Sequence, residues 1–349
     1  MSNDVQGQQV LFEGMDRFCG PLHQSDIGMM LRCRRAMLYR YKLGLRPKSD
    51  LRAGAAGLGQ MFHKIVQYGP GGIEFAKKWV QDQQKILWEL VEKGEDVDGS
   101  IAGAVKAMTD HYNKAMAIAQ LYWERYPDPE YLETLATEVH VEGDVEICGN
   151  KVTVAGTIDK VVRDKRDGRL WVRDWKTSSR DMNYIMTGYQ WSIQCRMYRL
   201  LAWLWAKQNE IENPEPLGFI VDGVRMPTIK YCKKDVDFAA YIERCKQWYK
   251  DNLIDAFTSR AIRYQEPMLS DIFMSSLVDA AYTQKDTALE LWQYPKDMTA
   301  SYCTNYDRQC TYYGLCEVDQ CQWPDIIERQ FKVVEPTDNV NTETGEVNE

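Results

Sequence analysis

The chain has 349 residues, of which 44% are hydrophobic, and a formal net charge of −8. This length can bury a sizeable core in one large domain or in two ordinary ones. The negative charge excludes a histone-like coat on nucleic acid, although an enzyme that holds DNA in one basic channel stays compatible with it. Because the sequence has neither an apolar run of about 18 residues nor a secretory leader, we expect a cytoplasmic protein without membrane contact.

Residues 1–52 form the first predicted segment, and their main feature is a basic helix. The helix is expected over residues 25–43, with Ser25 as its N-cap. Contact with the phosphate backbone of DNA is the functional interpretation of this basic density, and a solvated basic face is the structural alternative. The expected DNA-binding residues are Arg32, Arg34, Arg35, Arg40 and Lys42.

Residues 53–130 are predicted to be mostly helical. A Gly-rich stretch over residues 53–59 leads into a helix that carries His63. Residues 74–126 continue with the helical spacing of apolar side chains, with a break near residues 94–99. A lone histidine on a helix is usually structural or exposed, so His63 becomes a candidate ligand only through the motifs that follow it.

Residues 131–234 change to the alternation that is typical of strands. Apolar residues alternate over 139–147, 152–154 and 169–175. This spacing predicts three strands of an antiparallel meander, with a turn at Asp167-Gly168. The fold class expected from this succession is α+β with an α/β core.

The remaining elements extend this core toward the C-terminus. Within residues 131–234 we expect a helix over 184–208 and a buried strand over 218–224. Residues 235–330 are predicted to hold C-terminal helices over 235–258 and 271–292 together with a group of cysteines. Residues 331–349 are polar and acidic, which predicts a disordered tail.

Two carboxylates and one ammonium stand out in the predicted sheet. Asp174 and Lys176 lie two positions apart on one strand and therefore project to the same side. If the neighbouring strand brings Asp159 alongside, two acids repel each other at one point, and a hard divalent cation relieves that repulsion. Such a cation activates water and polarises a phosphodiester. The structural alternative is an ordinary salt bridge on a solvated face.

Polar residues also recur on the helix that follows the strands. Gln190, Gln194 and Tyr198 are spaced so that they share one helical face, although amphipathic packing would give the same spacing. The order His63, Asp159, Asp174-x-Lys176, Gln194-x-x-x-Tyr198 resembles the RecB-like branch of the PD-(D/E)XK nucleases. That branch includes AddAB-type nuclease domains, CRISPR-adaptation exonucleases and phage recombination exonucleases.

The resemblance implies a mixed central sheet flanked by helices and a role for each motif residue. It implies that His63, Asp159 and Asp174 bind Mg²⁺ or Mn²⁺ and that Lys176 is catalytic. It implies that Gln194 and Tyr198 support the site and the DNA. One departure is that the second acid, often Glu in the family, is Asp174 here. An imidazole among oxygen ligands favours Mn²⁺ somewhat more than an all-oxygen site would.

The chain has ten cysteines, four of which are crowded near its end. In a reducing compartment such crowding points to a metal or cluster site rather than to disulfides, although free cysteines stay possible. Three of them, together with a distant one, suit a 4Fe–4S cluster or zinc. The resemblance favours iron, with Cys321 as a competing ligand, and implies the set Cys33, Cys303, Cys310 and Cys316.

These expectations combine into a metal-dependent exonuclease that processes DNA ends for recombination or repair. The compact chain resembles phage or mobile-element enzymes, which would place it in the cytoplasm of a bacterial host. The sequence has no P-loop motif, so unwinding would need a helicase partner, and a strand-annealing recombinase is the other expected partner. The alternatives are a structure-specific endonuclease or resolvase of the same superfamily, and a non-catalytic iron–sulfur module that binds DNA.

Overall fold

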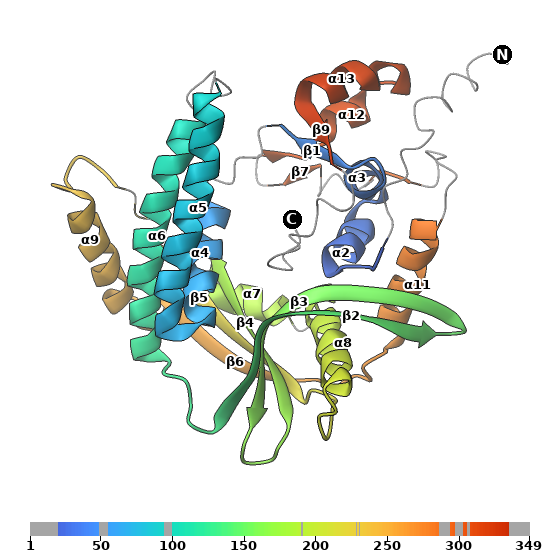
Figure 1. Ribbon diagram of the computed structural model, residues 1–349, viewed down its shortest axis with the longest axis horizontal. Coiled ribbons are helices and arrows are strands. Elements are labelled where there is room, and N and C mark those ends of the chain that lie inside the picture. The colour runs from blue at the N-terminus through green and yellow to red at the C-terminus, as the bar shows by residue number, and fades with distance from the viewer. Residues whose placement is uncertain are drawn as a thin grey trace.

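A five-stranded sheet forms the centre of the computed structural model (Figure 1). The strands have the spatial order β2-β3-β4-β5-β6. Their bounds are β2 Leu132–Ile147, β3 Asn150–Asp164, β4 Leu170–Ser178, β5 Gly218–Arg225 and β6 Phe257–Arg263. The structure describes residues 20–48, 55–93, 100–189, 191–227, 229, 231–285, 294–296, 303–305 and 308–334.

The sheet is mixed, as expected. Strands β2, β3 and β4 form an antiparallel meander, which confirms the prediction from alternation. Gly168 adopts φ +72° in the turn before β4, a conformation that glycine tolerates without steric cost. Strand β5 pairs parallel to β4, so the chain has to cross over between them, and it does so through two helices.

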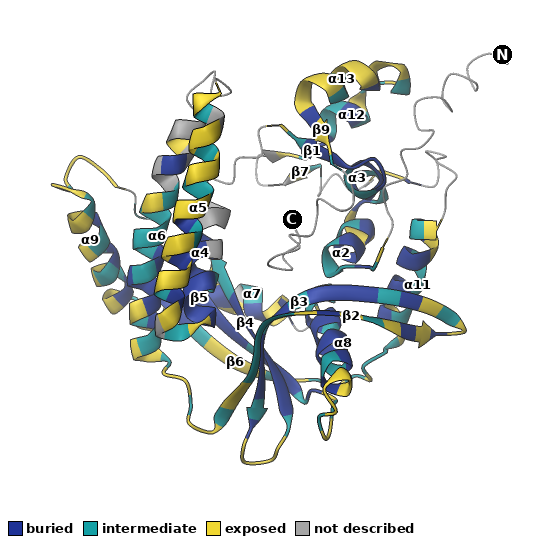
Figure 2. Cartoon of the chain, viewed as in Figure 1, coloured by how far each residue is buried: buried dark blue, intermediate teal, exposed yellow. Residues whose placement is uncertain are grey.

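Helices cover both faces of the sheet. Their bounds are α2 Gln24–Arg32, α4 Ala55–Gln67, α5 Gly72–Glu92, α6 Ser100–Arg125, α7 Met182–Tyr189, α8 Ile193–Gln208, α9 Phe238–Asp251, α10 Leu253–Ala256 and α11 Asp271–Lys285. Helices α4 and α6 pack with Trp175 on one face, whereas α2 and α8 pack with Val172 in a second cluster. Figure 2 shows the sheet and the inward sides of these helices as the buried part of the molecule.

Two helical predictions are wrong in part. The helix expected over 184–208 is interrupted, because Ser192 accepts a hydrogen bond from the Cys195 backbone and begins α8 as a new helix. The helix expected over 235–258 ends early, and β6 begins at Phe257 as an edge strand. Most of β6 is exposed, so its sequence lacks the alternation that would reveal a strand.

The N-terminal helix expected over 25–43 is also wrong in part, because it breaks at Cys33. Helix α2 begins after the N-cap His23 rather than at Ser25 and ends before Cys33. Cys33 has extended backbone, and its thiol caps the next short helix by accepting a hydrogen bond from Ala36 N at 3.5 Å. The following elements are α3 Arg34–Met37 and a π-helical turn over Leu38–Lys42.

The two ends of the described chain pack against each other (Figure 1). Strand β1, Leu45–Pro47, pairs antiparallel with β9, Phe331–Val333. The ring of Tyr39 lies 5.4 Å from that of Tyr312 and 5.1 Å from that of Trp323. The prediction of a disordered tail over residues 331–349 is wrong at its start, because Phe331–Val333 form β9, whereas residues 335–349 lie outside the described residues. The intervening elements are β7 Thr304–Asn305, β8 Arg308–Gln309, α12 Tyr313–Glu317 and α13 Trp323–Gln330.

Among the helices within the described ranges, none combines the length and the apolar composition that crossing a lipid bilayer requires.

Candidate active site

The sheet opens between β3 and β4 at the two candidate acids. The paired residues of these strands run from Arg163 opposite Leu170 to Lys160 opposite Arg173. Asp159 and Asp174 are the next residue on each strand, directly beyond the last pair. Strand β4 continues to pair with β5 as far as Ser178, so it keeps its direction while β3 diverges.

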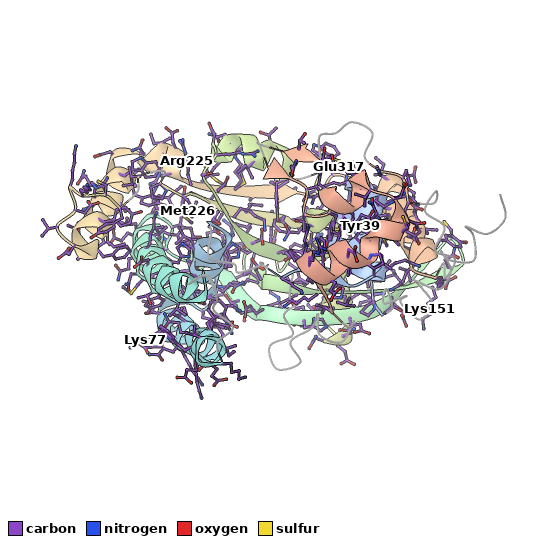
Figure 3. The ribbon with its side chains drawn as sticks, turned by 90° about the horizontal axis from the view of Figure 1, so that it is seen from above. Tyr39, Lys77, Lys151, Arg225, Met226 and Glu317 are labelled. Atoms are coloured by element: carbon purple, nitrogen blue, oxygen red, sulfur yellow. The ribbon has the colours of Figure 1, made fainter. Side chains whose placement is uncertain are left out.

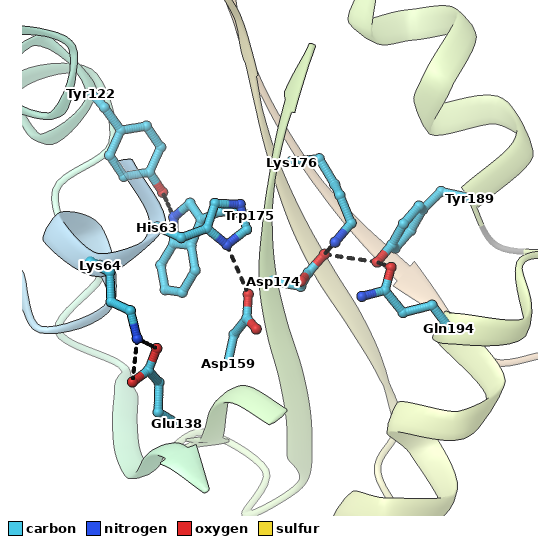
Figure 4. Close-up of polar contacts among 10 residues, drawn as sticks. All are labelled: His63, Lys64, Tyr122, Glu138, Asp159, Asp174, Trp175, Lys176, Tyr189 and Gln194. Atoms are coloured by element: carbon cyan, nitrogen blue, oxygen red, sulfur yellow. Dashed lines mark hydrogen bonds and ion pairs between the residues drawn. The ribbon is translucent and has the colours of Figure 1, made fainter. Parts of the chain in front are cut away.

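Helix α4 supplies the histidine of the site. Nδ1 of His63 lies 3.5 Å from Oδ2 of Asp159 (Figure 4). The next residue, Lys64, forms an ion pair at 3.3 Å with Glu138, and the Tyr68 hydroxyl donates to the same carboxylate at 2.7 Å. These contacts hold α4 to strand β2 beside the site.

Lysine and tyrosine hold the second acid. Nζ of Lys176 lies 2.6 Å from Oδ2 of Asp174, and the Tyr189 hydroxyl donates to the same oxygen at 2.7 Å. Oε1 of Gln194 lies 3.0 Å from that hydroxyl (Figure 4). Since Asp174 is only 1% exposed, this is a buried ion pair and not the solvated salt bridge that was the structural alternative.

The structure brings five of the sequence-predicted residues together: His63, Asp159, Asp174, Lys176 and Gln194. Tyr198 is buried behind them, where its ring stacks on Phe219 at 6.1 Å. Burial raises the pKa of the Tyr189 phenol beside Asp174, and the charges of Asp174 and Tyr198 help to raise it. Gln190 lies outside the described residues. Tyr189 lies beside Asp174, and this residue was not predicted from the sequence as part of the site. The only available signal was its position five residues before Gln194, which is not a helical repeat.

The two carboxylates provide the donor set for a cation. Oδ2 of Asp159 and Oδ1 of Asp174 are buried and have no partner in ordinary hydrogen-bond geometry, although Nδ1 of His63 lies 3.5 Å from Oδ2 of Asp159. A buried acceptor without a partner is costly, and a hard divalent cation satisfies it. No three His, Cys, Asp or Glu side chains in the described ranges already converge on one point, because each acid is paired with its own base. The residues therefore fit Mg²⁺ or Mn²⁺ in their chemistry.

The acids differ in their affinity for a proton. Burial would raise the pKa of Asp159, but His63, a hydrogen bond with Asp174 and the charge of Lys176 together lower it to about 2. Burial raises the pKa of Asp174 to about 7, with the charge of Asp159 adding to the rise and Lys176 opposing it. The pair therefore holds one proton below neutral pH, and that proton competes with a cation.

This pair makes stability depend on pH and on metal. Because the folded-state pKa of Asp174 is raised, its contribution to stability is present below pH 4 and is lost as the pH rises toward 7. The contribution of Asp159 is lost only toward pH 2, well outside that range. We expect Mg²⁺ to raise the melting temperature more at pH 8 than at pH 5. Thermal unfolding with and without Mg²⁺ measures this, and Asp174→Asn should remove most of the difference; an equal shift at both pH values contradicts it.

A second polar network stiffens β4 from its other face. Nε of Arg173 donates to the buried Asp222 at 2.7 Å, and a terminal nitrogen donates to the Tyr122 hydroxyl at 3.1 Å. Nε1 of Trp175 donates to the same hydroxyl at 2.9 Å. These side chains flank Asp174 in sequence, so the network fixes the backbone that presents the acid. This network was not predicted from the sequence, although the alternation over 169–175 includes both Arg173 and Trp175.

The cysteines lie in the region where the chain ends meet. Burial raises the pKa of the Cys310 thiol, and repulsion from three neighbouring cysteines raises it further. Those three are Cys33, Cys303 and Cys316. Sγ of Cys316 lies 3.8 Å from the Tyr39 hydroxyl, and Cys321 is exposed on a separate turn. No three thiols of the described residues lie at coordination distance from one point, so the cluster stays a proposal.

The basic segment is less available to DNA than expected. Lys42 is fully buried, so the prediction that it contacts DNA is wrong. Arg34 is paired with Asp279, and Nε of Arg35 donates to the Tyr294 carbonyl at 2.8 Å. These partners engage both side chains, but Arg34 and Arg35 stay partly exposed. Arg32 is exposed and Arg40 is partly exposed, so DNA contact stays a prediction for all four arginines.

Comparison with known proteins identifies one family. Residues 22–317 match the family model described as "PD-(D/E)XK nuclease superfamily". A solved structure titled "Crystal structure of SSO0001" shares 14% sequence identity, covers 61% of this chain and 79% of that chain, and has a TM-score of 0.28. That similarity is too low to carry an argument. No curated protein matches the chain.

Proposed function

Because the chain belongs to the PD-(D/E)XK nuclease superfamily, we propose that it is an exonuclease that hydrolyses DNA phosphodiester bonds from an end. Membership makes it a metal-dependent nuclease that acts on DNA with Mg²⁺ or Mn²⁺. The observation that carries the proposal is the meeting of buried carboxylate oxygens of Asp159 and Asp174 with Lys176 where β3 and β4 separate.

Each residue of the site has a proposed task. A divalent cation held by His63, Asp159 and Asp174 would supply activation of water and polarisation of the phosphodiester. Lys176 is the partly exposed member of its ion pair, with 23% of its side chain accessible, so its ammonium is the group that reaches the phosphate. There it stabilises the negative charge that develops on the phosphate oxygens. Tyr189 positions Asp174 through its hydrogen bond.

The need for an end is tested with matched DNA substrates. We expect linear duplex DNA to be degraded progressively in Mg²⁺ or Mn²⁺, whereas covalently closed circles of the same sequence stay intact. Single-strand and duplex forms labelled at either end give the polarity. Cleavage of the circles at a comparable rate would instead favour the structure-specific endonuclease or resolvase, and binding without cleavage would favour the non-catalytic module.

The proposed place of this activity is the processing of DNA ends in recombination or repair. The resemblance to RecB-like and phage enzymes supports a strand-annealing recombinase or a helicase as its partner. The exposed Arg32 and the partly exposed Arg40 would then contact the DNA backbone, and removing both should reduce the salt dependence of binding.

We also propose that four cysteines hold a 4Fe–4S cluster. Their mutual repulsion as thiolates, which raises the pKa of Cys310, is the kind of clustering that a cationic iron centre relieves. The cluster would join α3 to the segment around α12, which the contacts of Tyr39 already bring together. Zinc is the less favoured occupant of the same thiols.

Anaerobic purification tests the cluster. We expect a brown protein with iron and acid-labile sulfide, because thiolate-bound iron absorbs visible light. Cys316→Ser should lose most of the colour and the iron, whereas Cys321→Ser serves as the matched control and should keep both. A colourless wild-type protein that contains zinc would contradict the iron assignment, and equal loss in both variants would contradict the ligand set.

A further inference from the structure

A cavity of about 370 Å³ lies at the end of β4, beside the candidate active site. Residues 177–179, which line it, directly follow Lys176. Leu58 lines it from α4, five residues before His63, which corresponds to about 7.5 Å along the helix. The cavity is therefore separated from the metal ligands by less than two helical turns, within reach of a nucleotide that neighbours the reacting one.

Aromatic side chains form one wall of this cavity. Tyr231 is 53% exposed, and its ring lies 5.8 Å from that of Tyr241 and 6.0 Å from that of Phe238. Tyr241 is fixed, because its hydroxyl donates to the Ile229 carbonyl at 3.1 Å and accepts from Nζ of Lys114 at 2.8 Å. An exposed ring on a fixed aromatic base is a platform on which a planar group can stack.

The polar lining suits the hydrogen-bonding edge of a base. The hydroxyls of Thr177, Ser178 and Ser179 offer donors and acceptors, and Asp110 offers acceptors. The charged lining is mixed, since the Asp110 carboxylate repels phosphate whereas Lys114, which donates to the Tyr241 hydroxyl, attracts it. Lys233 and Lys234, which are exposed and follow Tyr231 after Cys232, do not line the cavity and would be available to a phosphate backbone that passes it.

Resting on the proposed function, we infer that this cavity binds one base of a single-stranded DNA end, stacked on Tyr231, next to the nucleotide being cleaved. The cavity lies where β4 and β5 end together, since Met226 N donates to the Ser178 carbonyl at 2.7 Å. Figure 3 labels Arg225 and Met226 at that end of β5. The enzyme would thus require an unpaired end and would engage a blunt duplex poorly until it frays.

Binding of fluorescein-labelled duplexes with single-stranded ends, measured by anisotropy in EDTA, tests the site without cleavage. We expect Tyr231→Ala to weaken binding by on the order of tenfold, Tyr231→Phe to bind as the wild type does, and blunt duplexes to be unaffected. Tyr282→Ala is the matched control, because Tyr282 is 60% exposed on the distant α11. A series of single abasic positions along the end should contain one that weakens the wild type but leaves Tyr231→Ala unchanged.

The outcomes separate this inference from the proposed function. Equal binding by wild type and Tyr231→Ala, or additive losses at every abasic position, overturns the base site even if the protein degrades DNA. Failure of the wild type to cleave any DNA, with binding that still depends on Tyr231, overturns the proposed function and keeps the base site. Unchanged melting temperatures show that the exposed ring was removed without unfolding.

Discussion

Replacing Lys176 by Ala is expected to lower the cleavage rate by about 10²–10³-fold while DNA binding is kept. The ammonium pairs with Asp174 at 2.6 Å and the Lys176 side chain is 23% exposed, so it is placed to meet the phosphate. The rate should fall in kcat rather than rise in KM, because charge on the phosphate oxygens develops only in the transition state. Single-turnover digestion of end-labelled DNA, with binding followed by anisotropy, measures both.

A lysine elsewhere on the sheet provides the control. Lys151 forms an exposed ion pair with Asp144 at 2.8 Å on the hairpin between β2 and β3, and Figure 3 labels it on the outside of the molecule. Lys151→Ala removes the same charge from an exposed pair far from the acids, so it should leave the rate unchanged. Equal effects of both substitutions would mean that Lys176 acts only through general electrostatics. Full activity of Lys176→Ala would remove it from the catalytic site.

Replacing either Asp159 or Asp174 by Asn should lower the cleavage rate even more than Lys176→Ala does. Asp159→Asn and Asp174→Asn each remove an anionic ligand, and the loss of several kcal/mol of metal-supplied stabilisation lowers the rate by on the order of 10³-fold or more. The fold should survive, because the amide keeps the size of the side chain. Asp174→Asn also removes a buried carboxyl whose pKa is about 7, so the metal-free variant should be more stable than the wild type at pH 8.

Cation binding and cleavage are measured on the same samples. Calorimetric titration with Mn²⁺ should show binding to the wild type and greatly weakened binding to both variants, in parallel with the loss of digestion. Asp144→Asn is the matched control, since Asp144 lies on the exposed hairpin pair and its loss should change neither quantity. Retained Mn²⁺ affinity in both variants would place the cation elsewhere.

Local sequence patterns were sufficient to predict most strands of the central sheet. Alternating apolar residues marked β2, β3 and β4, and the buried run that became β5 stood out in the same way. The edge strand β6 was not predicted, because only its first residue is fully buried and four of the other six are exposed. Periodicity reports which face of an element is buried, so an element with almost no buried face leaves no pattern.

The order of the motifs along the chain indicated the candidate site more strongly than their spacing did. His63, Asp159 and Lys176 are each unremarkable alone, and it was their succession that indicated a nuclease. Tyr198 fitted the helical face of Gln194 equally well, yet it packs against Phe219 while Tyr189 holds Asp174. The start of a new helix at Ser192 separates Tyr189 from the face that Gln194 and Tyr198 share, and such breaks depend on caps that a helical repeat does not reveal.

Residue types and local periodicity were sufficient to predict the fold class, the meander and the acids, lysine and histidine of the site. Three features became visible only in the folded chain. Strands β3 and β4 separate at Asp159 and Asp174, Lys42 is buried, and an aromatic cavity lies beside the site. The physical reason is that these features arise from contacts between segments far apart in the chain. Packing against those segments sets where strands separate and which side chains stay exposed.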